Sequence, residues 1–299
     1  MKTDAAGKVV GVETTDLESL QPLSIEASSV VLATGGFGRN VDMRVKYNSE
    51  MGDSYKCTDC AGATGDGVVM AEEAGASLVD MQFIQTHPTG DPQNGAMLDV
   101  GSIRVDGCAV MVNKEGNRFV EELARRDVAS SATIAQTGSL GYFVFSKSAA
   151  EAGGYFEWGA DEIASMTERG LFVEGDTLEA ICEPFGIDAS TLATTIDTWN
   201  TDCKAGADSQ FGYRAEMFPI DASPYCAFAC CPTVHYTMGG VSIDPSARVL
   251  NEAGEPISGL FAAGEVTGNV MGTNRLGTTA IPDIIGFGRI AGASASLSA

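Results

Sequence analysis

Hydrophobic and polar positions at the start of the chain predict two strands. Residues 8–13 (K-V-V-G-V-E) alternate, and residues 23–33 (L-S-I-E-A-S-S-V-V-L-A) pass from alternation to a continuous apolar stretch. The second stretch leads directly into Thr34-Gly-Gly-Phe-Gly38, which holds too many glycines for a packed helix. A buried strand that ends in such a turn commonly brings backbone close to a ligand at the carboxyl edge of a sheet.

A second glycine-rich turn, Gly62-Ala-Thr-Gly-Asp-Gly67, precedes a helical pattern over residues 68–74. The free N–H groups and the dipole of a helix amino terminus favour an anion, although a tight structural turn would give the same string. The one near match to a dinucleotide-binding glycine pattern, Gly286-Phe-Gly-Arg-Ile-Ala291, lies inside a predicted helix. Because no βα unit follows it, we reject it as a nucleotide fingerprint.

The middle of the chain, roughly residues 90–230, is more polar and less repetitive. It predicts helices at 119–136, 160–169 and 189–203, and it has the character of an inserted or capping domain. The last third predicts a strand at 241–243, a turn at 251–254 and a helix at 279–298. In that helix Thr279 is the expected N-cap and Pro282 lies in the first turn.

Composition excludes several classes of protein. The 299 residues are 44% hydrophobic and 19% charged, which indicates a folded globular chain. A net charge of −22 disfavours a nucleic-acid or anionic-membrane partner, and no apolar run reaches the length of a membrane span. The eight cysteines are scattered. Cys57-x-x-Cys60 lacks the second pair or nearby histidine of a zinc site, so we expect no metal site.

The chain holds only two histidines, and each lies in a patterned segment: His87 in Q-T-H-P-T and His235 in H-Y-T-M-G-G. A single histidine is more often structural than functional, but imidazole also suits the binding of anions and protons. A basic pair, Arg125-Arg126, precedes Asp127 and could be an ordinary pair on a helix face.

Six motifs in this order carry a resemblance to a known family. They are A-T-G-G-F-G (33–38), T-G-D-G (64–67), Q-T-H-P-T (85–89), R-F-V-E-E with R-R-D (118–127), H-Y-T-M-G-G (235–240), and G-L-F-A-A-G-E-V-T-G with N-R-L-G (259–277). Together the chain resembles the flavoprotein subunit of fumarate reductase and succinate dehydrogenase, especially the soluble, flavocytochrome c-type fumarate reductases. The resemblance covers nearly the whole chain.

This resemblance implies an α/β (α+β) fold. A partial Rossmann-like FAD-binding domain would comprise residues 1–84 and 233–299, and a capping domain would comprise residues 85–232. The βαβ unit that binds the FAD pyrophosphate in this family has no counterpart here, so we expect the chain to be a fragment, a shortened form or one product of a split gene, the last with an N-terminal half as partner. An electron-donor protein or domain, with haem or flavin, is a further expected partner. The sequence leaves localisation open.

The resemblance also assigns residues to FAD. Thr64, Gly65 and Asp66 would approach the cofactor, as would the backbone of Tyr236, and Glu265 would lie near its ribityl or phosphate region. The start of the last helix, around Ala280 and Ile281, would point at the flavin pyrimidine, where a positive helix end stabilises negative charge on reduced flavin. Arg275 would border both cofactor and substrate.

For the substrate, the resemblance implies a carboxylate clamp of His87, His235 and Arg275, with Arg126 as the catalytic acid and Arg104 as its relay arginine. Arginine can bind a carboxylate through two hydrogen bonds. The implied reaction is reduction of an α,β-unsaturated carboxylate, by hydride transfer from flavin N5 and protonation of the neighbouring carbon. Positioning and electrostatics would supply most of the catalysis.

Two departures from the family pattern bear on the substrate. Gly101, within Val100-Gly-Ser-Ile-Arg-Val105, occupies the position at which the family has a glutamate of the proton relay. Met271 occupies a position at which the family usually has a histidine. A less polar pocket wall suits an apolar group better than a second carboxylate. We therefore expect a monocarboxylate or bulkier enoate rather than fumarate.

Two alternatives remain open. One is a dehydrogenase or oxidase of the same superfamily, such as succinate dehydrogenase, aspartate oxidase or a ketosteroid dehydrogenase. The other is a flavin-free remnant or a subunit of a split enzyme.

Overall fold

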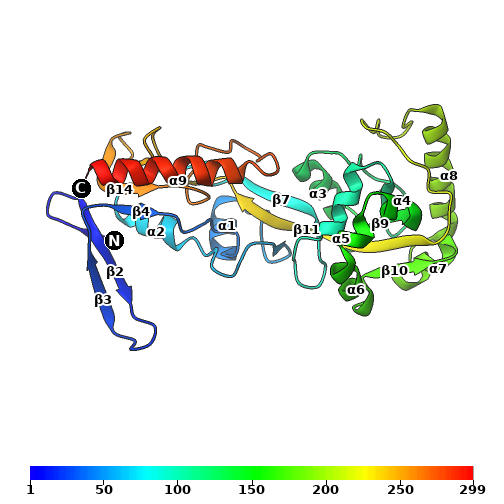
Figure 1. Ribbon diagram of the computed structural model, residues 1–299, viewed down its shortest axis with the longest axis horizontal. Coiled ribbons are helices and arrows are strands. Elements are labelled where there is room, and N and C mark those ends of the chain that lie inside the picture. Colours follow the sequence, from blue (N-terminus) through cyan, green and yellow to red (C-terminus); the bar gives the residue numbers. More distant parts are fainter. Residues whose placement is uncertain (299) are drawn as a thin grey trace. The chain divides into compact units, whose positions relative to one another are not determined.

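The computed structural model describes residues 1–298, apart from the side chain of Trp158, and divides into two compact units (Figure 1). Unit 1 comprises Met1–Gln85 and the chain from Val234 onward, and unit 2 comprises Thr86–Thr233. Each boundary lies one residue beyond the one expected from the sequence. The mixture of helices and strands confirms the expected α/β (α+β) class.

Unit 1 begins with a three-stranded antiparallel sheet of β1 (Lys2–Thr3), β2 (Val9–Thr15) and β3 (Pro22–Glu26). The single strand expected over 23–33 is wrong, because it is two strands in two sheets. The alternating part forms β3 with all its residues exposed, whereas the continuous apolar part forms β4 (Val30–Leu32). Thus the change from alternation to continuity marks the break.

The second sheet of unit 1 has the order β13 (Arg248–Leu250), β14 (Pro256–Ala262), β4. Strands β14 and β4 are parallel, with Leu260 opposite Val30 and Ala262 opposite Leu32, so both carboxyl ends lie at one edge. Helix α9 (Ala280–Leu297) lies along β14 and β4 (Figure 1), and its Ala291 packs with Phe261 and Ala263.

The remaining elements of unit 1 are short. They are α1 (Val41–Tyr47), β5 (Lys56–Cys57), α2 (Asp66–Glu73), β6 (Leu78–Val79) and β12 (Gly240–Val241). Helix α2 confirms the helical pattern expected over 68–74. Thr279 is the N-cap residue of α9, as expected, but its side chain makes no capping hydrogen bond, because its hydroxyl donates to the Leu276 carbonyl at 2.7 Å.

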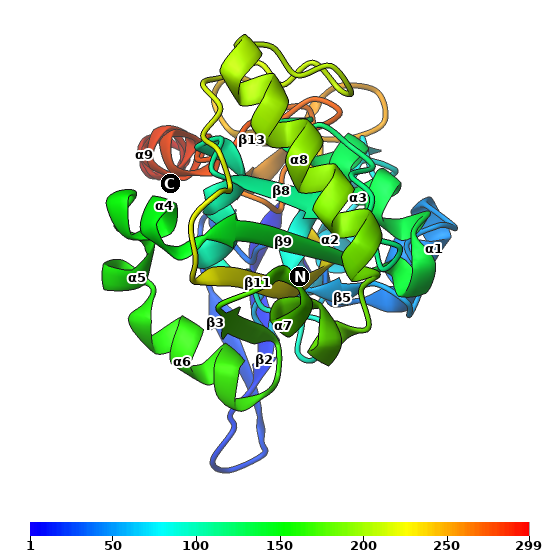
Figure 2. The ribbon, with the colours of Figure 1, turned by 90° about the vertical axis from the view of Figure 1, so that its right-hand side faces the viewer.

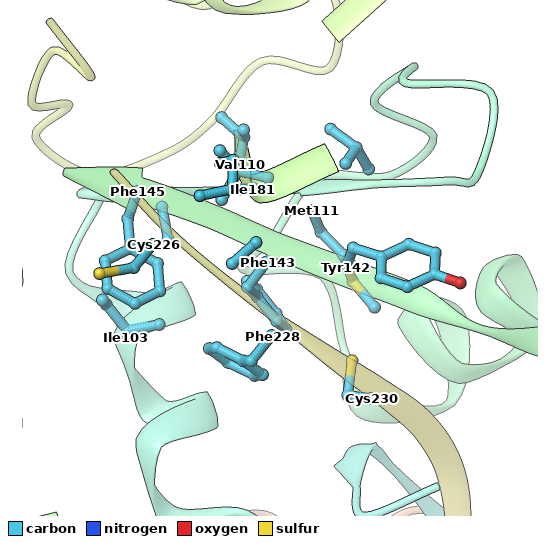
Figure 3. Close-up of a cluster of buried hydrophobic side chains, with 14 of the residues drawn as sticks. Ile103, Val110, Met111, Tyr142, Phe143, Phe145, Ile181, Cys226, Phe228 and Cys230 are labelled. Carbon is cyan, nitrogen blue, oxygen red and sulfur yellow. The ribbon is translucent and has the colours of Figure 1, made fainter. Parts of the chain in front are cut away.

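Unit 2 is built on a sheet with the order β10 (Phe172–Gly175), β11 (Tyr225–Thr237), β9 (Gly141–Ser146), β8 (Ala109–Val112). Strands β8, β9 and β11 lie side by side in Figure 2, and β7 (Ile84–Gly90) also pairs with β11. Phe143 and Phe228 stack with their ring centroids 5.1 Å apart in the core of this unit (Figure 3).

The helices of unit 2 surround this sheet. They are α3 (Arg126–Ile134), α4 (Lys147–Ala152), α5 (Tyr155–Trp158), α6 (Ala160–Glu168), α7 (Leu178–Cys182) and α8 (Ala189–Ala205), with 3-10 turns η1 (Asp99–Val105), η2 (Thr137–Ser139) and η3 (Glu183–Phe185). Helices α6 and α8 confirm the helices expected over residues 160–169 and 189–203.

The helix expected over 119–136 is wrong in its first half, because α3 begins only at Arg126. The preceding segment is drawn into the core, where Glu122 accepts hydrogen bonds from Arg118 and from the N–H of Met111.

None of the helices within residues 1–298 combines the length and apolar character needed to cross a membrane.

Candidate functional site

The turn after β4 lies against two polar side chains of unit 1. A Cβ added to Gly36 would lie 2.1 Å from Thr237 Oγ1 and 2.4 Å from Glu265 Oε1. Glu265 in turn accepts hydrogen bonds from the Thr237 N–H at 2.8 Å and from its hydroxyl at 3.0 Å. Only glycine fits this close approach, so packing against Thr237 and Glu265 explains Gly36, whereas Gly38 lies against Asp59.

The amino terminus of α2 is joined to the same turn. The Gly65 N–H donates to the Gly36 carbonyl at 3.1 Å, and Gly67 lies directly against Thr34. Gly65 is the N-cap in the left-handed conformation, and no side chain caps the helix, which Asp66 begins. An amino terminus without a side-chain cap leaves N–H donors for a ligand. Thr64, Gly65 and Asp66, which the family resemblance assigns to FAD, therefore lie at a helix start that has N–H donors to offer.

The start of α9 lies close to the residue that precedes Glu265. A Cβ at Gly264 would lie 3.2 Å from Ile284 Cγ2, which brings the first turns of α9 beside the residue before Glu265. Ala280 and Ile281 open this helix, and Ile281 is about half exposed. Just before it, the Thr279 hydroxyl contacts Met271 Sδ at 3.7 Å. Met271 is thus near the start of α9.

Arg275 is held in a stacked position in unit 1. Its guanidinium carbon lies 4.4 Å from the centroid of the Tyr236 ring, and its backbone carbonyl accepts from Gln85 Nε2 at 2.6 Å. The residue is 9% exposed, and its buried Nε has no hydrogen-bond partner within residues 1–298. A buried cationic donor of this kind needs an acceptor, so the arrangement fits an anionic ligand.

His235 is positioned by a residue that the sequence analysis missed. Its Nδ1 lies 2.8 Å from the hydroxyl of Thr58, which also contacts the Val234 carbonyl at 3.3 Å. Thr58 belongs to the Cys57-x-x-Cys60 segment, in which no motif marks it as a partner of His235.

Burial raises the pKa values of two carboxyl groups that lie against the turn after β4, Glu265 at Gly36 and Asp59 at Gly38. Burial raises the pKa of Glu265 to about 7, with the nearby Asp59 as the next cause. Burial also raises the pKa of Asp59, whose carboxylate lies against Gly38 and accepts from Cys57 Sγ at 3.4 Å. The pKa of the Cys57 thiol is raised to about 12, chiefly by burial, so this cysteine is a poor nucleophile.

In unit 2, His87 is bonded by a residue two positions further along the chain. Its Nδ1 accepts the Thr89 N–H at 3.3 Å and lies 3.0 Å from the Thr89 hydroxyl. A Cβ at Gly101 would lie 2.6 Å from the Cβ of Thr89. A glutamate at position 101 would displace Thr89. The glycine at this position is therefore needed for Thr89 to contact His87.

Arg104 lies in η1 and binds the loop that precedes α3. Its Nη1 donates to the Glu122 carbonyl at 2.5 Å, and its own carbonyl accepts from Tyr213 Oη at 3.2 Å. Burial lowers the pKa of its guanidinium.

The carboxylate of Glu122 is bonded twice by Arg118, at 2.8 and 3.0 Å. Arg118 also binds Asp208 twice, at 2.9 and 3.0 Å, and all three side chains are fully buried. This buried ion network therefore anchors the loop before α3, whose Glu122 carbonyl accepts the hydrogen bond from Arg104.

The two adjacent arginines differ in their surroundings. Arg125 is the N-cap residue of α3 and pairs with Asp127 through two contacts of 2.7 Å at an exposed site. Arg126 is the first residue of the helix. The helix dipole does not favour a cation in the first turn, so helix stability does not explain Arg126.

The contacts bring together within unit 1 the segments that carry Thr64, Gly65, Asp66, Tyr236, Glu265, Arg275, Ala280 and Ile281. His235 also belongs to unit 1, whereas His87, Arg104 and Arg126 belong to unit 2. Sequence reasoning missed Thr58, Asp59, Thr89 and Thr237 as supporting residues. Thr89 and Thr237 each lie two residues after a histidine, and that shared spacing is the signal that could have found them.

Comparison with known proteins decides the family. A model of the FAD-binding domain family matches residues 2–281, which is almost the whole chain. The chain belongs to the FAD-binding domain family. FAD is accordingly its cofactor, as the glycine-lined turn, the uncapped α2 terminus and the buried Arg275 donor allow. Among residues 1–298 no group of three His, Cys, Asp or Glu side chains is arranged to hold a metal ion.

Two relatives of the chain are named as a reductase and an oxidoreductase. The chain is 50% identical to a urocanate reductase of Eggerthella lenta over 293 residues, covering 98% of this chain and 48% of that protein. It is 40% identical to an NADH:acrylate oxidoreductase of Vibrio harveyi, covering 97% and 29%.

The chain also resembles the open conformation of a flavocytochrome c3 fumarate reductase, with a TM-score of 0.81 and 38% identity, over 100% of this chain and 51% of that one. The expected resemblance is confirmed, and the chain spans about half or less of the length of these relatives.

Proposed function

We propose that the chain is part of an FAD-dependent oxidoreductase that reduces the C=C bond of an α,β-unsaturated carboxylate. The proposal rests on Arg275, a buried guanidinium held against the Tyr236 ring with an Nε that has no partner within residues 1–298. Such a donor suits a substrate carboxylate, and in relatives named for urocanate and acrylate the substrate is an acrylate.

Within this proposal the residues have separate roles. His235 and Arg275 of unit 1 bind the carboxylate, and His87 of unit 2 adds a further donor. Arg126 delivers a proton to the carbon next to the one that receives hydride, and Arg104 returns a proton to Arg126. Reduced FAD, when bound, supplies the hydride. The protein contributes by positioning the substrate and by stabilising its negative charge.

The proposed substrate is a monocarboxylate with an apolar or aromatic group, not a dicarboxylate. Gly101 packs against Thr89 and offers no polar side chain, and Met271 presents a thioether beside Thr279. A second carboxylate would require paired donors that glycine and methionine do not supply. Two relatives are named for monocarboxylates, urocanate and acrylate, and a solved relative is named for the dicarboxylate fumarate, so the choice rests on Gly101 and Met271.

The active protein needs additional polypeptide. Helix α9 exposes Ile281 (52%), Ile284 (48%) and Ile285 (57%), and β4 forms an edge of its sheet among the described residues. An apolar surface of this kind marks an interface. We assign it to polypeptide that completes the FAD-binding domain. We further propose an electron-donor protein or domain, with haem or flavin, as the source of reducing equivalents.

Flavin absorbance and a substrate panel test the proposal. The chain is purified alone and together with the completing segment of a relative, and the flavin band is recorded. Reduced-dye oxidation is then followed with acrylate, urocanate, cinnamate and fumarate. We expect flavin binding and turnover of an acrylate. Colourless protein in both preparations would contradict the role of FAD as cofactor. Turnover of fumarate equal to that of the best acrylate would contradict the proposal that the substrate is a monocarboxylate.

A further inference from the structure

One side of helix α6 binds both ends of the segment that joins β7 to η1. Glu162, in the first turn of α6, accepts hydrogen bonds from the N–H groups of Asp99 at 3.0 Å and Val100 at 2.7 Å. Arg169, which follows the last turn, donates to the Asp91 carboxylate at 2.6 Å. Seven positions are about two turns of a helix, so both side chains lie on one side of α6. The helix therefore fixes this segment at its beginning and at its end.

The same segment is also bound to β7. Gly90 and Met97 form an antiparallel bridge, and the Leu98 N–H donates to the Thr89 carbonyl at 2.9 Å. Gly101, in η1, lies directly against Thr89, since a Cβ added to the glycine would come within 2.6 Å of the threonine Cβ. The place of η1 is therefore set by contacts to two elements of unit 2, β7 and α6.

Arg104 lies near the end of η1, so its place depends on where this turn is held. Its Nη1 donates to the Glu122 carbonyl, and its own carbonyl accepts from Tyr213 Oη at 3.2 Å. The first N–H groups of a helical turn have no partner within it, and Glu162 supplies acceptors for two of them. Because a 3-10 turn is short and closed by its own hydrogen bonds, a displacement of its start is transmitted to Arg104.

We propose that Glu162 and Arg169 are positioning residues, which hold Arg104 in place through the segment that α6 binds. Glu162 has the larger part, because its two oxygens hold the turn that carries Arg104. Arg169 holds the far end of the segment and has the smaller part. Neither residue is assigned to FAD or to the substrate by the family resemblance. The effect on the reaction rests on the proposed function, in which Arg104 returns a proton to Arg126.

NMR of the 299-residue chain tests the positioning without flavin or substrate. The side-chain ¹⁵Nε signal of Arg104 is assigned with Arg104→Lys, and amide hydrogen exchange is measured at Asp99 and Val100. In Glu162→Ala we expect both amides to exchange roughly ten- to hundredfold faster, as for loss of hydrogen bonds to a charged group, and the Arg104 signal to shift. Faster exchange with an unchanged Arg104 signal would overturn the proposal for Glu162.

Two further variants in the first turn of α6 separate positioning from the loss of a charge. Glu162→Gln keeps one acceptor oxygen, so both effects should be smaller, and the test does not depend on the folding of the alanine variant. Asp161→Asn removes an equal charge one residue earlier, at an exposed position, and should leave the Arg104 signal unchanged. Equal shifts in Asp161→Asn and Glu162→Ala would show that charge near α6, and not the two hydrogen bonds, acts on Arg104.

The part of Arg169 is tested by two substitutions. Arg169→Met removes the cation from Asp91, and we expect it to shift the Arg104 signal by less than Glu162→Ala does. Arg169→Lys keeps a charge beside Asp91 and should return the signal towards that of the wild type. An unchanged Arg104 signal in Arg169→Met would remove Arg169 from the proposal.

Kinetics of the flavin-loaded protein then tests the link to the reaction. Glu162→Ala should lower kcat with acrylate about tenfold, because small displacements of a positioned group cost at least this much, and should leave KM within about twofold. Asp161→Asn should keep the wild-type kcat. A raised KM with an unchanged kcat in Glu162→Ala would show that Glu162 acts on substrate binding and not through Arg104. A wild-type protein without reductase activity would contradict the proposed function, whereas the NMR result would still decide the positioning.

Discussion

Glu265 accepts two hydrogen bonds from Thr237, one from its N–H at 2.8 Å and one from its hydroxyl at 3.0 Å. These bonds favour the carboxylate, yet burial raises the pKa of Glu265 to about 7. Desolvation therefore outweighs the two donors, and Glu265 exchanges its proton near neutral pH.

The raised pKa predicts that Glu265 makes stability depend on pH. The folded chain binds this proton more tightly than the unfolded chain, whose carboxyl has an ordinary pKa of 4.5. Its contribution is complete below about pH 4.5 and is lost as the pH rises through about 7. At about 1.4 kcal/mol for each pKa unit, the loss is on the order of 3 kcal/mol.

Urea unfolding at pH 5 and pH 8 measures this contribution. The free energy of unfolding should fall more in the wild type than in Glu265→Gln, and the exposed control Glu252→Gln should behave as the wild type. The same fall in wild type and Glu265→Gln would show that Glu265 is not the titrating group.

The close approach at Gly36 predicts that alanine is not tolerated there. A Cβ at position 36 would collide with Thr237 Oγ1 and Glu265 Oε1, which both lie against the turn that follows β4. We expect Gly36→Ala to weaken FAD binding by roughly 5- to 150-fold, since overpacking of about 1–3 kcal/mol is concentrated at the cofactor turn. Flavin titration of the apoprotein measures it.

Gly52→Ala is the matched control, because nothing lies within 4 Å of a Cβ at Gly52. Wild-type flavin affinity in Gly36→Ala would show that the turn relaxes without consequence.

The fold was predictable where the pattern is long or changes sharply. Helices α6 and α8 have continuous periodicity, and both were expected within two residues of their ends. Helix α3 was not, because the polar residues before it look helical in sequence. Only the long-range pairing of Arg118 with Asp208, 90 positions away, draws them into the core.

The candidate site shows a similar limit. Motifs identified the residues proposed to act on cofactor or substrate, because such residues lie in glycine-rich or histidine-containing strings. Thr58 could not be identified in this way, since its partner His235 is 177 positions away. The role of Gly101 as packing against Thr89 likewise depends on tertiary contact.

The buried ion network in unit 2 predicts a large cost for losing Arg118. Its removal leaves Glu122 and Asp208 as two buried carboxylates without their cation, and breaking such a pair costs about 3–5 kcal/mol. We expect Arg118→Met to lower the free energy of unfolding of unit 2 by that amount, as measured by urea denaturation.

The control is Arg214→Met, which removes an ion pair with Glu121 at an exposed arginine. Exposed pairs contribute about 0–1 kcal/mol. Equal losses in Arg118→Met and Arg214→Met would mean that the buried network does not stabilise the loop that binds Arg104.

The adjacent arginines at the start of α3 allow the proposed acid to be tested against a near-identical control. Arg126→Gln should lower kcat by about 10²–10⁴-fold, the usual contribution of a positioned proton donor, while flavin stays bound. Arg125→Gln removes an equal charge one residue earlier, from an exposed pair with Asp127. It should change kcat by less than about threefold, because exposed ion pairs contribute little.

Stopped-flow oxidation of the reduced flavin by acrylate measures both variants. The solvent isotope effect separates proton delivery from substrate binding. A lowered kcat with unchanged KM in Arg126→Gln supports Arg126 as the proton donor, because a proton donor need not take part in substrate binding. Undiminished turnover in Arg126→Gln would show that another group donates the proton. Equal losses in the two variants would show that the charge near α3, and not the position of Arg126, supports the reaction.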